Sequence, residues 1–262
     1  MAWSVDSLID DLRKLGLGPG DTVLVHSSLR AIGRVSGGAA GVVAAIRQVL
    51  GDEGTLVVPT FNEENSKTSR AHLERIEGLT EQQAQAFREG MPAFDKSSTP
   101  SSTGRISEQV RHLPDAERSD HPVVSFAAAG AKAKSVTADH ARDCYHGEES
   151  PLGRLYAEGA SVLLVGVGYD KCAAFHLAEY HMEDAPRGTY WFVIDDGAGP
   201  DWQSVESIIL DDGDFAELGA DFEKETGLAK PGRLGSAQAR LLPMAPAVDF
   251  AVSWLSVHRR AR

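Results

Sequence analysis

The sequence predicts an α/β protein in which helices flank a mixed central sheet. Three short apolar runs have the length of buried strands: residues 22–25, 55–59 and 161–165. Helical patterns follow the first and the third run, at residues 39–50 and from about residue 173. A strand, a helix and a second strand in succession favour neighbouring parallel strands. With 42% hydrophobic residues, we expect residues 1–262 to form one domain with a substantial core.

The N-terminal part supplies the first helix and an insertion. Residues 3–15 have an amphipathic helical pattern that ends at Gly16, after which the chain turns into the first strand. Residues 62–93 interrupt the alternation of strands and helices with a polar segment rich in Glu and Gln, and we expect a helix at residues 80–89. Because this segment has little apolar periodicity, it predicts a peripheral flap or lid.

The rest of the chain continues the alternation. A helix is expected at residues 105–112, with Ser102 or Thr103 as its N-cap, and an apolar strand at residues 123–128. Beyond residue 186 the pattern predicts, in order, two antiparallel strands at 187–194 and 204–210, a helix at 214–226, a turn at 230–235, a strand at 239–242 and a terminal helix at 247–258.

Composition and charge exclude several classes of protein. The net charge of −12 argues against a nucleic-acid partner, which needs a basic surface, and is compatible with a cationic substrate. The N-terminus carries Asp6, Asp10 and Asp11 in a helical pattern, unlike a signal peptide, and no apolar run approaches the length of a membrane span. Cys144 and Cys172 form neither a disulfide framework nor a CxxC site. We therefore expect a soluble cytoplasmic protein without a membrane partner.

The third strand leads into the predicted catalytic centre. Gly166 and Gly168 let the backbone turn after residue 165, and ligands bind at the C-terminal edge of the strands in open α/β sheets. On the helix that follows, His176 and Glu179 are three residues apart and share a face. A carboxylate beside an imidazole fixes its tautomer and stabilises the imidazolium, so the pair suits a positioned base. The alternative is a partly exposed ion pair without a catalytic role.

Two loops rich in hydroxyl groups and glycine each open a helix, at residues 26–38 and 95–104. The first contains His26-Ser-Ser and the pair Gly37-Gly38, and the second ends in Ser101-Ser-Thr-Gly104. Because the N-terminus of a helix attracts anions, the two loops together suit a phosphorylated cofactor. In the alternative interpretation they only connect elements and cap helices.

Other enzyme classes fit these residues less well. A dinucleotide-dependent oxidoreductase requires GxGxxG, but Lys171 stands where the third glycine belongs. The GxSxG elbow of a serine hydrolase is absent. A metal hydrolase would use the scattered histidines, but they show neither HxH nor HExxH spacing, so no metal is expected; they are His121, His146, His176 and His181.

Six segments occur in an order that is typical of one family. They are Val25-His-Ser-Ser-Leu-Arg30, Gly54-Thr-Leu-Val-Val-Pro-Thr-Phe61, Phe94-Asp-Lys-Ser-Ser-Thr-Pro100, Arg118-Ser-Asp-His-Pro122, Glu149-Ser-Pro-Leu-Gly-Arg-Leu155, and Leu163 through His176-Leu-Ala-Glu179. In these segments the chain resembles the aminoglycoside 3-N-acetyltransferases, over roughly residues 5–256. Each motif alone is weak, but six in the family's order point to the family.

The resemblance implies transfer of an acetyl group from acetyl-CoA to the 3-amino group of a 2-deoxystreptamine aminoglycoside, which gives antibiotic resistance. It also implies a fold distinct from that of the common N-acetyltransferase superfamily. His176 would remove the proton from the amine, which attacks the thioester directly, and Glu179 would orient the imidazole. Backbone N–H groups at residues 27–29 are candidate donors to the oxyanion. The residues expected to bind acetyl-CoA are Ser27, Ser28, Leu29, Arg34, Val35, Ser102, Thr103 and Gly104.

An acceptor with several amines would be held by carboxylates. Those near the inferred cleft are Asp95, Glu148, Glu149, Asp170 and Glu179, with Glu223 as a further candidate on the helix predicted at 214–226. The chain departs from the family at Asp170-Lys171-Cys172-Ala173, where an Asn-Thr or similar polar pair is common, and Lys171 would oppose a polycation. The open alternatives are an acetyl-CoA-dependent N-acyltransferase for another amine and a non-catalytic aminoglycoside-binding protein. We expect a monomer or a homodimer.

Overall fold

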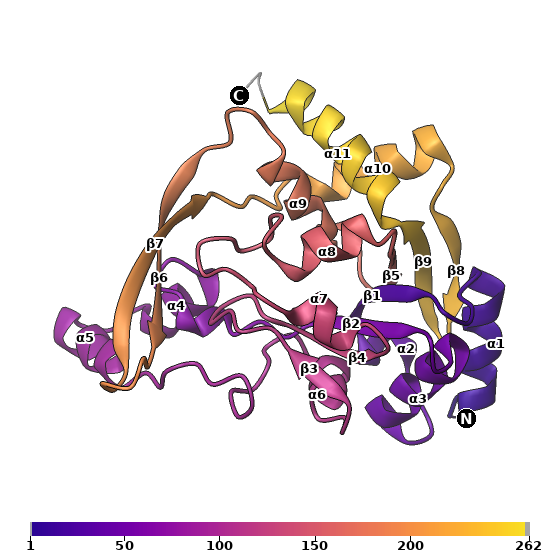
Figure 1. The fold of residues 1–262 in the computed structure, drawn as a ribbon, viewed down its shortest axis with the longest axis horizontal. Helices are drawn as coiled ribbons and strands as arrows, with labels where there is room; N and C mark the ends of the chain where they lie inside the picture. Colours follow the sequence, from indigo (N-terminus) through magenta and orange to yellow (C-terminus); the bar gives the residue numbers. More distant parts are fainter. Residues whose placement is uncertain (1, 260–262) are drawn as a thin grey trace.

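The computed structural model describes residues 2–259 and confirms the mixed central sheet. Within these residues, seven strands form one sheet in the order β3-β4-β2-β1-β5-β9-β8, and two strands form a separate hairpin (Figure 1). The strands of the sheet are β1 (Thr22–Ser27), β2 (Thr55–Pro59), β3 (Ala116–Arg118), β4 (Phe126–Gly130), β5 (Ser161–Val165), β8 (Lys230–Leu234) and β9 (Ala237–Pro243). Those of the hairpin are β6 (Arg187–Ile194) and β7 (Asp201–Ile208).

Helices cover both faces of the sheet, as predicted. They are α1 (Val5–Leu15), α2 (Leu29–Ile32), α3 (Gly38–Leu50), α4 (Arg70–Ile76), α5 (Glu81–Glu89), α6 (Arg105–Arg111), α7 (Ala133–Thr137), α8 (Pro151–Ala157), α9 (Ala174–Tyr180), α10 (Phe215–Thr226) and α11 (Met244–His258). Two short 3₁₀ helices are η1 (Glu63–Asn65) and η2 (Tyr169–Lys171). None of those described, within residues 2–259, has the length and hydropathy that a membrane crossing requires.

The centre of the sheet is parallel and its sides are antiparallel. β1 pairs in parallel with β2 and with β5, in registers that place Val23 opposite Leu56 and His26 opposite Leu164. β4 joins β2 antiparallel, and β9 joins β5 antiparallel. The predicted parallel pairing of the first two strands is confirmed. The carboxyl ends of β1, β2 and β5 therefore meet at one edge of the sheet.

The two faces of the sheet are buried under different helices. Side chains alternate along a strand, so Val23 and Val25 of β1 pack with α1, α3 and α6, whereas Leu24 packs on the other side with α8 to α11. Figure 1 shows α8 to α11 together on one side of the sheet. Local sequence sets both ends of α1. Ser4 Oγ caps its start by accepting the N–H of Ser7, and the helix ends, as predicted, at Gly16, which has a left-handed φ of 102°.

The insertion at residues 62–93 packs against the β6–β7 hairpin. Asn65 accepts a hydrogen bond from the backbone N–H of Val193 (2.8 Å) and donates one to its carbonyl (3.0 Å), which extends the pairing of β6. Lys67 Nζ lies 4.5 Å from the centre of the Trp191 ring, a cation–π contact. These contacts hold the insertion on the hairpin at the end of the molecule opposite to α1 (Figure 1).

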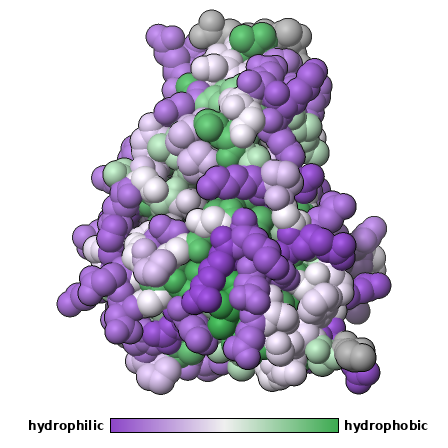
Figure 2. Space-filling model, turned by 90° about the vertical axis from the view of Figure 1, so that its right-hand side faces the viewer, coloured by the Kyte–Doolittle hydropathy of each residue, from purple (hydrophilic) through white to green (hydrophobic). Residues whose placement is uncertain are grey.

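Where the sequence predicted a turn, at residues 230–235, the structure has the edge strand β8, which pairs antiparallel with β9. Pro231 and Gly232 indicated a turn, but a proline is tolerated in an edge strand because one side of it needs no N–H donor. The exposed Lys230, Pro231 and Arg233 also protect this edge against pairing with another chain. Figure 2 shows that the end of the molecule with α1 and β8 is largely hydrophilic.

Two further predictions of local structure were wrong. The strand predicted at 123–128 begins only at Phe126, because His121 Nδ1 accepts the N–H groups of Val123 and Val124 (both 3.1 Å) and holds them in a turn. The N-cap of α6 is Gly104 rather than a hydroxyl residue.

Two elements also differ from the expected pattern. The short α4 was not predicted because it lacks apolar periodicity, and β7 begins at Asp201, before the predicted residue 204. Pairing with β6 sets the start of β7, since Asp201 lies opposite Ile194.

Candidate active site

A cavity of about 320 Å³ lies at the carboxyl ends of the three parallel strands. Ser27 at the end of β1 and Pro59 at the end of β2 line it, together with the segment that follows β5. His176 of α9 forms another part of its wall. This is the edge at which ligands bind in open α/β sheets, and the sequence predicted the site there.

The turn after β5 places His176 at this edge. Gly166 has φ 64°, and a Cβ atom on it would lie 2.3 Å from the Cβ of Ala31, so only glycine fits. The chain then forms η2 and enters α9. The ring of Tyr169 packs directly on Gly219 of α10, where a Cβ would lie 2.0 Å from Tyr169 Cγ. Two close backbone approaches therefore fix the start of the helix that carries His176.

The predicted pair on α9 is joined by a hydrogen bond. His176 Nδ1 lies 2.6 Å from Glu179 Oε2, and the Glu179 side chain is only 1% exposed. The second oxygen, Oε1, accepts the N–H of Asp211 (3.0 Å) and a hydrogen bond from Arg259 Nη1 (2.5 Å). An ionised carboxylate only accepts, so Nδ1 carries the proton and Nε2 is the ring nitrogen with a free lone pair.

Two further histidines flank His176. The ring of His146 stacks on it, and His26 lies on the wall of the same 320 Å³ cavity. Burial, followed by the charge of His176, lowers the pKa of His26 to about 4 and that of His146 well below its ordinary value. Both are therefore neutral near pH 7, so neither adds a positive charge beside His176.

A second cavity, of about 630 Å³, adjoins the first and also contains His176 in its wall. The insertion and the β6–β7 hairpin line it, with Tyr190 and Thr189 on the hairpin side. Glu63 and Asp212 line both cavities. His176 is thus accessible from two neighbouring spaces, which suits a reaction between two substrates.

Comparison with known proteins identifies the origin of this arrangement. The family model described as aminoglycoside 3-N-acetyltransferase matches residues 24–256. The chain belongs to this family. The resemblance predicted from the six sequence segments is therefore confirmed.

The chain is similar to several aminoglycoside N-acetyltransferases. It is 38% identical to the SPbeta prophage-derived aminoglycoside N(3')-acetyltransferase-like protein YokD of Bacillus subtilis (strain 168), over 95% of this chain and 90% of that protein. It is 35% identical to aminoglycoside N(3)-acetyltransferase VII of Streptomyces paromomycinus, with the same shares covered.

Solved structures of such proteins have the same fold. The crystal structure of YokD from Bacillus subtilis superimposes with a TM-score of 0.89, at 36% identity, over 97% of this chain and 98% of that one. AAC-IIIb in a binary complex with CoASH has a TM-score of 0.84 at 28% identity, over 98% and 97% of the two chains. AAC-VIa bound to sisomicin has a TM-score of 0.83 at 28% identity, over 99% of both.

In this member of the aminoglycoside 3-N-acetyltransferase family, the predicted cofactor residues fall into two groups. Ser27 and Thr103 line the 320 Å³ cavity, and Thr103 Oγ1 donates to the carbonyl of Pro59 (2.5 Å). Ser28 instead caps α2 through the N–H of Ala31 (3.3 Å). The backbone N–H of Ser28 bonds to the carbonyl of Val165 (2.9 Å), so this candidate oxyanion donor is engaged within the fold.

The other predicted cofactor residues lie along the same loops but not on the cavity wall. Leu29 begins α2 and packs against the core, Ser102 Oγ donates to the carbonyl of Phe61 (3.0 Å), and Gly104 precedes α6. Arg34 and Val35 lie beside the N-terminus, where the N–H of Trp3 donates to the carbonyl of Arg34 (2.8 Å). The two loops therefore meet the cavity through Ser27 and Thr103. Ser107 also lines the cavity, although no motif in the sequence marks it.

Of the predicted acceptor carboxylates, Asp170 lines the cavity, where its side chain pairs with Lys171 (3.3 Å). The others have partners elsewhere: Asp95 accepts from its own loop, Glu148 pairs with His181, and Glu223 bonds to Tyr169 and Arg240. Hydrogen bonds from Ser97 and Ser98 hold the pKa of Asp95 well below its usual range.

The carboxylates that sequence reasoning missed are Glu63 and Asp212. Glu63 could have been found, since it follows the end of β2 by only four residues. Asp212 carries no such signal, because the hairpin that precedes it brings it to the cavity.

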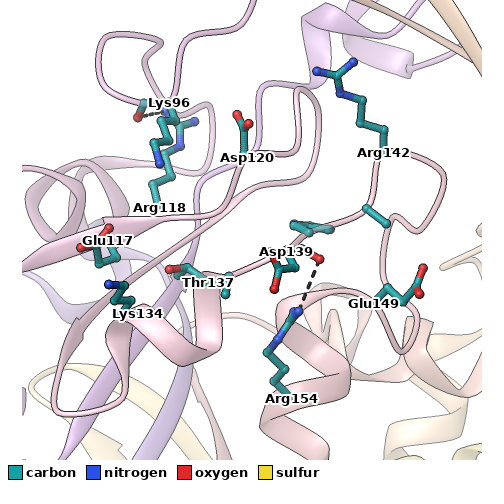
Figure 3. Close-up of a pocket in the computed structure, with 13 residues that line it drawn as sticks. Lys96, Glu117, Arg118, Asp120, Lys134, Thr137, Asp139, Arg142, Glu149 and Arg154 are labelled. Atoms are coloured by element: carbon teal, nitrogen blue, oxygen red, sulfur yellow. Dashed lines mark hydrogen bonds between the residues drawn. The ribbon is translucent and has the colours of Figure 1, made fainter.

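Glu149, the remaining acid considered, lies in a separate hollow of about 740 Å³ (Figure 3). Side chains of both signs line this hollow, and Figure 3 shows Arg154 directed at the carbonyl of Asp139. Arg118 is held by the carbonyls of Lys96 and Thr99 among other partners, which gives it a structural role. The mixed charge of the hollow selects no particular ligand. Among residues 2–259, no three His, Cys, Asp or Glu side chains are grouped as a metal site.

Proposed function

We propose that this protein transfers the acetyl group of acetyl-CoA to the 3-amino group of a 2-deoxystreptamine aminoglycoside, with His176 as general base. The observation that carries the proposal is the place of His176 between two cavities, with its Nδ1 bonded to the buried Glu179. Membership of the aminoglycoside 3-N-acetyltransferase family supports the reaction. Relatives of the same fold with CoASH and with sisomicin support the two substrate classes.

The two cavities meet at His176 and share Glu63 and Asp212, and we assign one substrate to each. The smaller cavity takes the acetyl-CoA end, because Ser27 and Thr103 connect it to the two hydroxyl-rich loops. The larger cavity takes the aminoglycoside, because it is the more spacious of the two and Glu63 and Asp212, at its border with the smaller cavity, offer carboxylates to ammonium groups. His176 then lies where the two substrates meet.

The reaction follows from the tautomer of His176. Glu179 keeps the proton on Nδ1, so Nε2 accepts a proton from the amine as its nitrogen attacks the thioester carbonyl carbon. The C–N bond forms and the carbonyl electron pair moves to oxygen. When the tetrahedral intermediate collapses, the C–S bond breaks and the imidazolium returns the proton to the departing thiolate. The products are the N-acetyl aminoglycoside and the free thiol of CoA.

The test is release of thiol from acetyl-CoA, measured over a panel of aminoglycosides and simple amines, with mass spectrometry of the product. The wild type should release thiol with an aminoglycoside. His176→Ala should lower kcat by roughly 10²–10⁴-fold, because the base is lost. His112→Ala is the matched control, since His112 is an exposed histidine at the end of α6.

The outcomes separate the alternatives. Near-normal turnover in a folded His176→Ala protein would remove His176 from the mechanism. Thiol release with simple amines alone would favour a different acceptor. Aminoglycoside binding by calorimetry without any thiol release would indicate a binding protein.

A further inference from the structure

Glu179 is itself held by a second ion pair that comes from the far end of the chain. Arg259, which follows α11, donates from Nη1 to Glu179 Oε1 (2.5 Å). The same guanidinium bonds to both carboxylate oxygens of Asp214, at 2.9 Å from Nε and 2.6 Å from Nη2. The four side chains thus form one line of charge, from Asp214 through Arg259 and Glu179 to His176.

The two carboxylates of this line of charge are almost completely buried. The side chains of Glu179 and Asp214 are 1% and 2% exposed, and that of Arg259 is 15% exposed. Burial alone would lower the pKa of Arg259, but the hydrogen bonds and charges of Asp214 and Glu179 outweigh it and raise the pKa. The guanidinium is therefore permanently charged, and removing it would leave two carboxylates with an uncompensated buried charge.

We propose that Arg259 and Asp214 are positioning residues of the catalytic centre. Arg259 occupies one oxygen of Glu179, which directs the other oxygen at His176 Nδ1. Asp214 holds the guanidinium in the plane required for this contact and offsets part of its charge. The inference rests on the proposed role of His176 as base, and it adds residues that lie 80 and 45 positions away from their partners along the chain.

The two residues act on His176 with opposite sign. Without Arg259, the negative charge of Glu179 is no longer balanced and favours the protonated imidazole, so the acid limb of the pH profile should move to higher pH. Without the charge of Asp214, the guanidinium is less offset and favours the neutral imidazole, so this limb should move to lower pH.

Other groups around the line leave this contrast intact. Every variant keeps the other ionisable side chains on the walls of the two cavities that contain His176, which are His26, Glu63, Arg70, Tyr145, His146, Asp170, Lys171, Cys172, Tyr190 and Asp212. Arg259 also donates to the carbonyl of Asp211, a contact without a titratable group. The difference between the pH profiles of the two variants therefore reports only the charges of Arg259 and Asp214.

A hollow of about 420 Å³ gives small molecules access to Arg259. It is lined by Glu179 and Arg259 and by apolar side chains that include Met182 and Ile209. Glu179 and Arg259 line this hollow and neither of the two cavities that contain His176, although Ile209 lines both the hollow and the larger cavity. In an Arg259→Ala variant, a free guanidinium ion can therefore enter from this side and restore the missing contact without displacing a substrate.

The experiment compares Arg259→Ala, Arg259→Lys and Asp214→Asn with the wild type in the thiol-release assay. Arg47→Ala is the matched control, because it also breaks an arginine–carboxylate pair with two hydrogen bonds, to Asp115, and neither residue lines a cavity that contains His176. Arg259→Ala should lower kcat by up to about 100-fold with an unchanged KM for acetyl-CoA. Guanidinium chloride should restore part of the rate, and sodium chloride at the same concentration should not. The kcat of Arg259→Lys should lie between those of Arg259→Ala and the wild type, since a lysine keeps the charge but cannot form the two-pronged contact of a guanidinium.

The pH profiles decide between positioning and a purely structural role. Opposite displacements of the acid limb in Arg259→Ala and Asp214→Asn support the proposal. The proposal is overturned if the acid limb of the pH profile stays in place in folded variants, or if guanidinium does not restore the rate of Arg259→Ala. Should Arg259→Ala not fold, the other two variants decide. A shift of the acid limb to lower pH in Asp214→Asn, together with a lowered kcat in Arg259→Lys, then supports the proposal, and the absence of both overturns it. The proposed function is tested separately, because an active His176→Ala protein contradicts the base, whereas an inactive one beside a fully active Arg259→Ala contradicts only the positioning role.

Discussion

The rings of His146 and His176 stack almost parallel, with centroids 5.1 Å and planes 10° apart. The stack restrains the plane of the His176 ring, and the hydrogen bond to Glu179 restrains its rotation within that plane. A base held in both ways keeps Nε2 aimed at one point between the two cavities. Positioning of this kind lowers the activation barrier, because the entropy cost of orienting the base is already met in the folded protein.

The stack can be tested by changing His146. His146→Phe keeps a flat ring and should retain most of kcat, whereas His146→Ala leaves a gap and should lower kcat by up to about 100-fold. KM for acetyl-CoA should stay near the wild-type value in both. Steady-state kinetics at pH 7 measures this, and an equal loss in the two variants would show that a ring nitrogen of His146 is needed rather than its shape.

Removal of the charge of Glu179 should be milder than removal of His176. Glu179→Gln keeps the shape but loses the fixed tautomer, so kcat should fall less than in His176→Ala. Circular dichroism should first establish that each variant is folded, because Glu179→Gln also removes the carboxylate that Arg259 contacts. A Glu179→Gln variant as inactive as His176→Ala contradicts the orienting role.

The two hydroxyl-rich loops should respond differently to substitution. Thr103 lines the cavity of about 320 Å³, so Thr103→Leu should raise KM for acetyl-CoA more than KM for the amine. Ser28 caps α2, so Ser28→Ala should lower the free energy of unfolding by about 1 kcal/mol with little effect on KM. A Thr103 variant that raises only the KM for the amine would assign this cavity to the acceptor.

Acceptor binding should depend on the acids of the larger cavity. Glu63→Gln and Asp212→Asn should each weaken aminoglycoside binding, and Asp95→Asn is a control because Asp95 is occupied by its own loop. The affinity should fall as salt is added, since exposed charge attraction is screened within about 8–10 Å. Lys171→Ala should tighten binding or leave it unchanged, and calorimetry measures each case. Loss of binding in Lys171→Ala would instead indicate an anionic group on the substrate.

The buried histidines should make stability fall as the pH falls. Burial lowers the pKa of His26 and of His140 to about 4, whereas an unfolded histidine titrates near 6.5. Between these values the unfolded chain binds protons that the folded chain does not, so each histidine costs about 1.4 kcal/mol per pH unit below 6.5. Urea unfolding should therefore show that the stability advantage of the wild type over His26→Gln shrinks from pH 7.5 to pH 5. The exposed His112→Ala should show no such change.

Local patterns in the sequence were sufficient for the family, for the three parallel strands and for the pair His176 and Glu179. Side chains three residues apart on a helix share a face whatever the rest of the chain does, and an apolar run between turns becomes a strand wherever a sheet can accept it. The single-domain organisation of residues 1–262 and the cytoplasmic location stay predictions.

Tertiary structure alone decided which charges act at the site. Glu223 and Glu148 looked equivalent to Asp170 in the sequence, but Arg240 and His181 occupy them in the fold. Arg259 reaches Glu179 only because α11 packs along α9, and residues 230–234 became a strand only because β9 lies beside them. The physical reason is the same each time. Pairing and electrostatic contacts depend on distance in space, which spacing along the chain specifies only within one element.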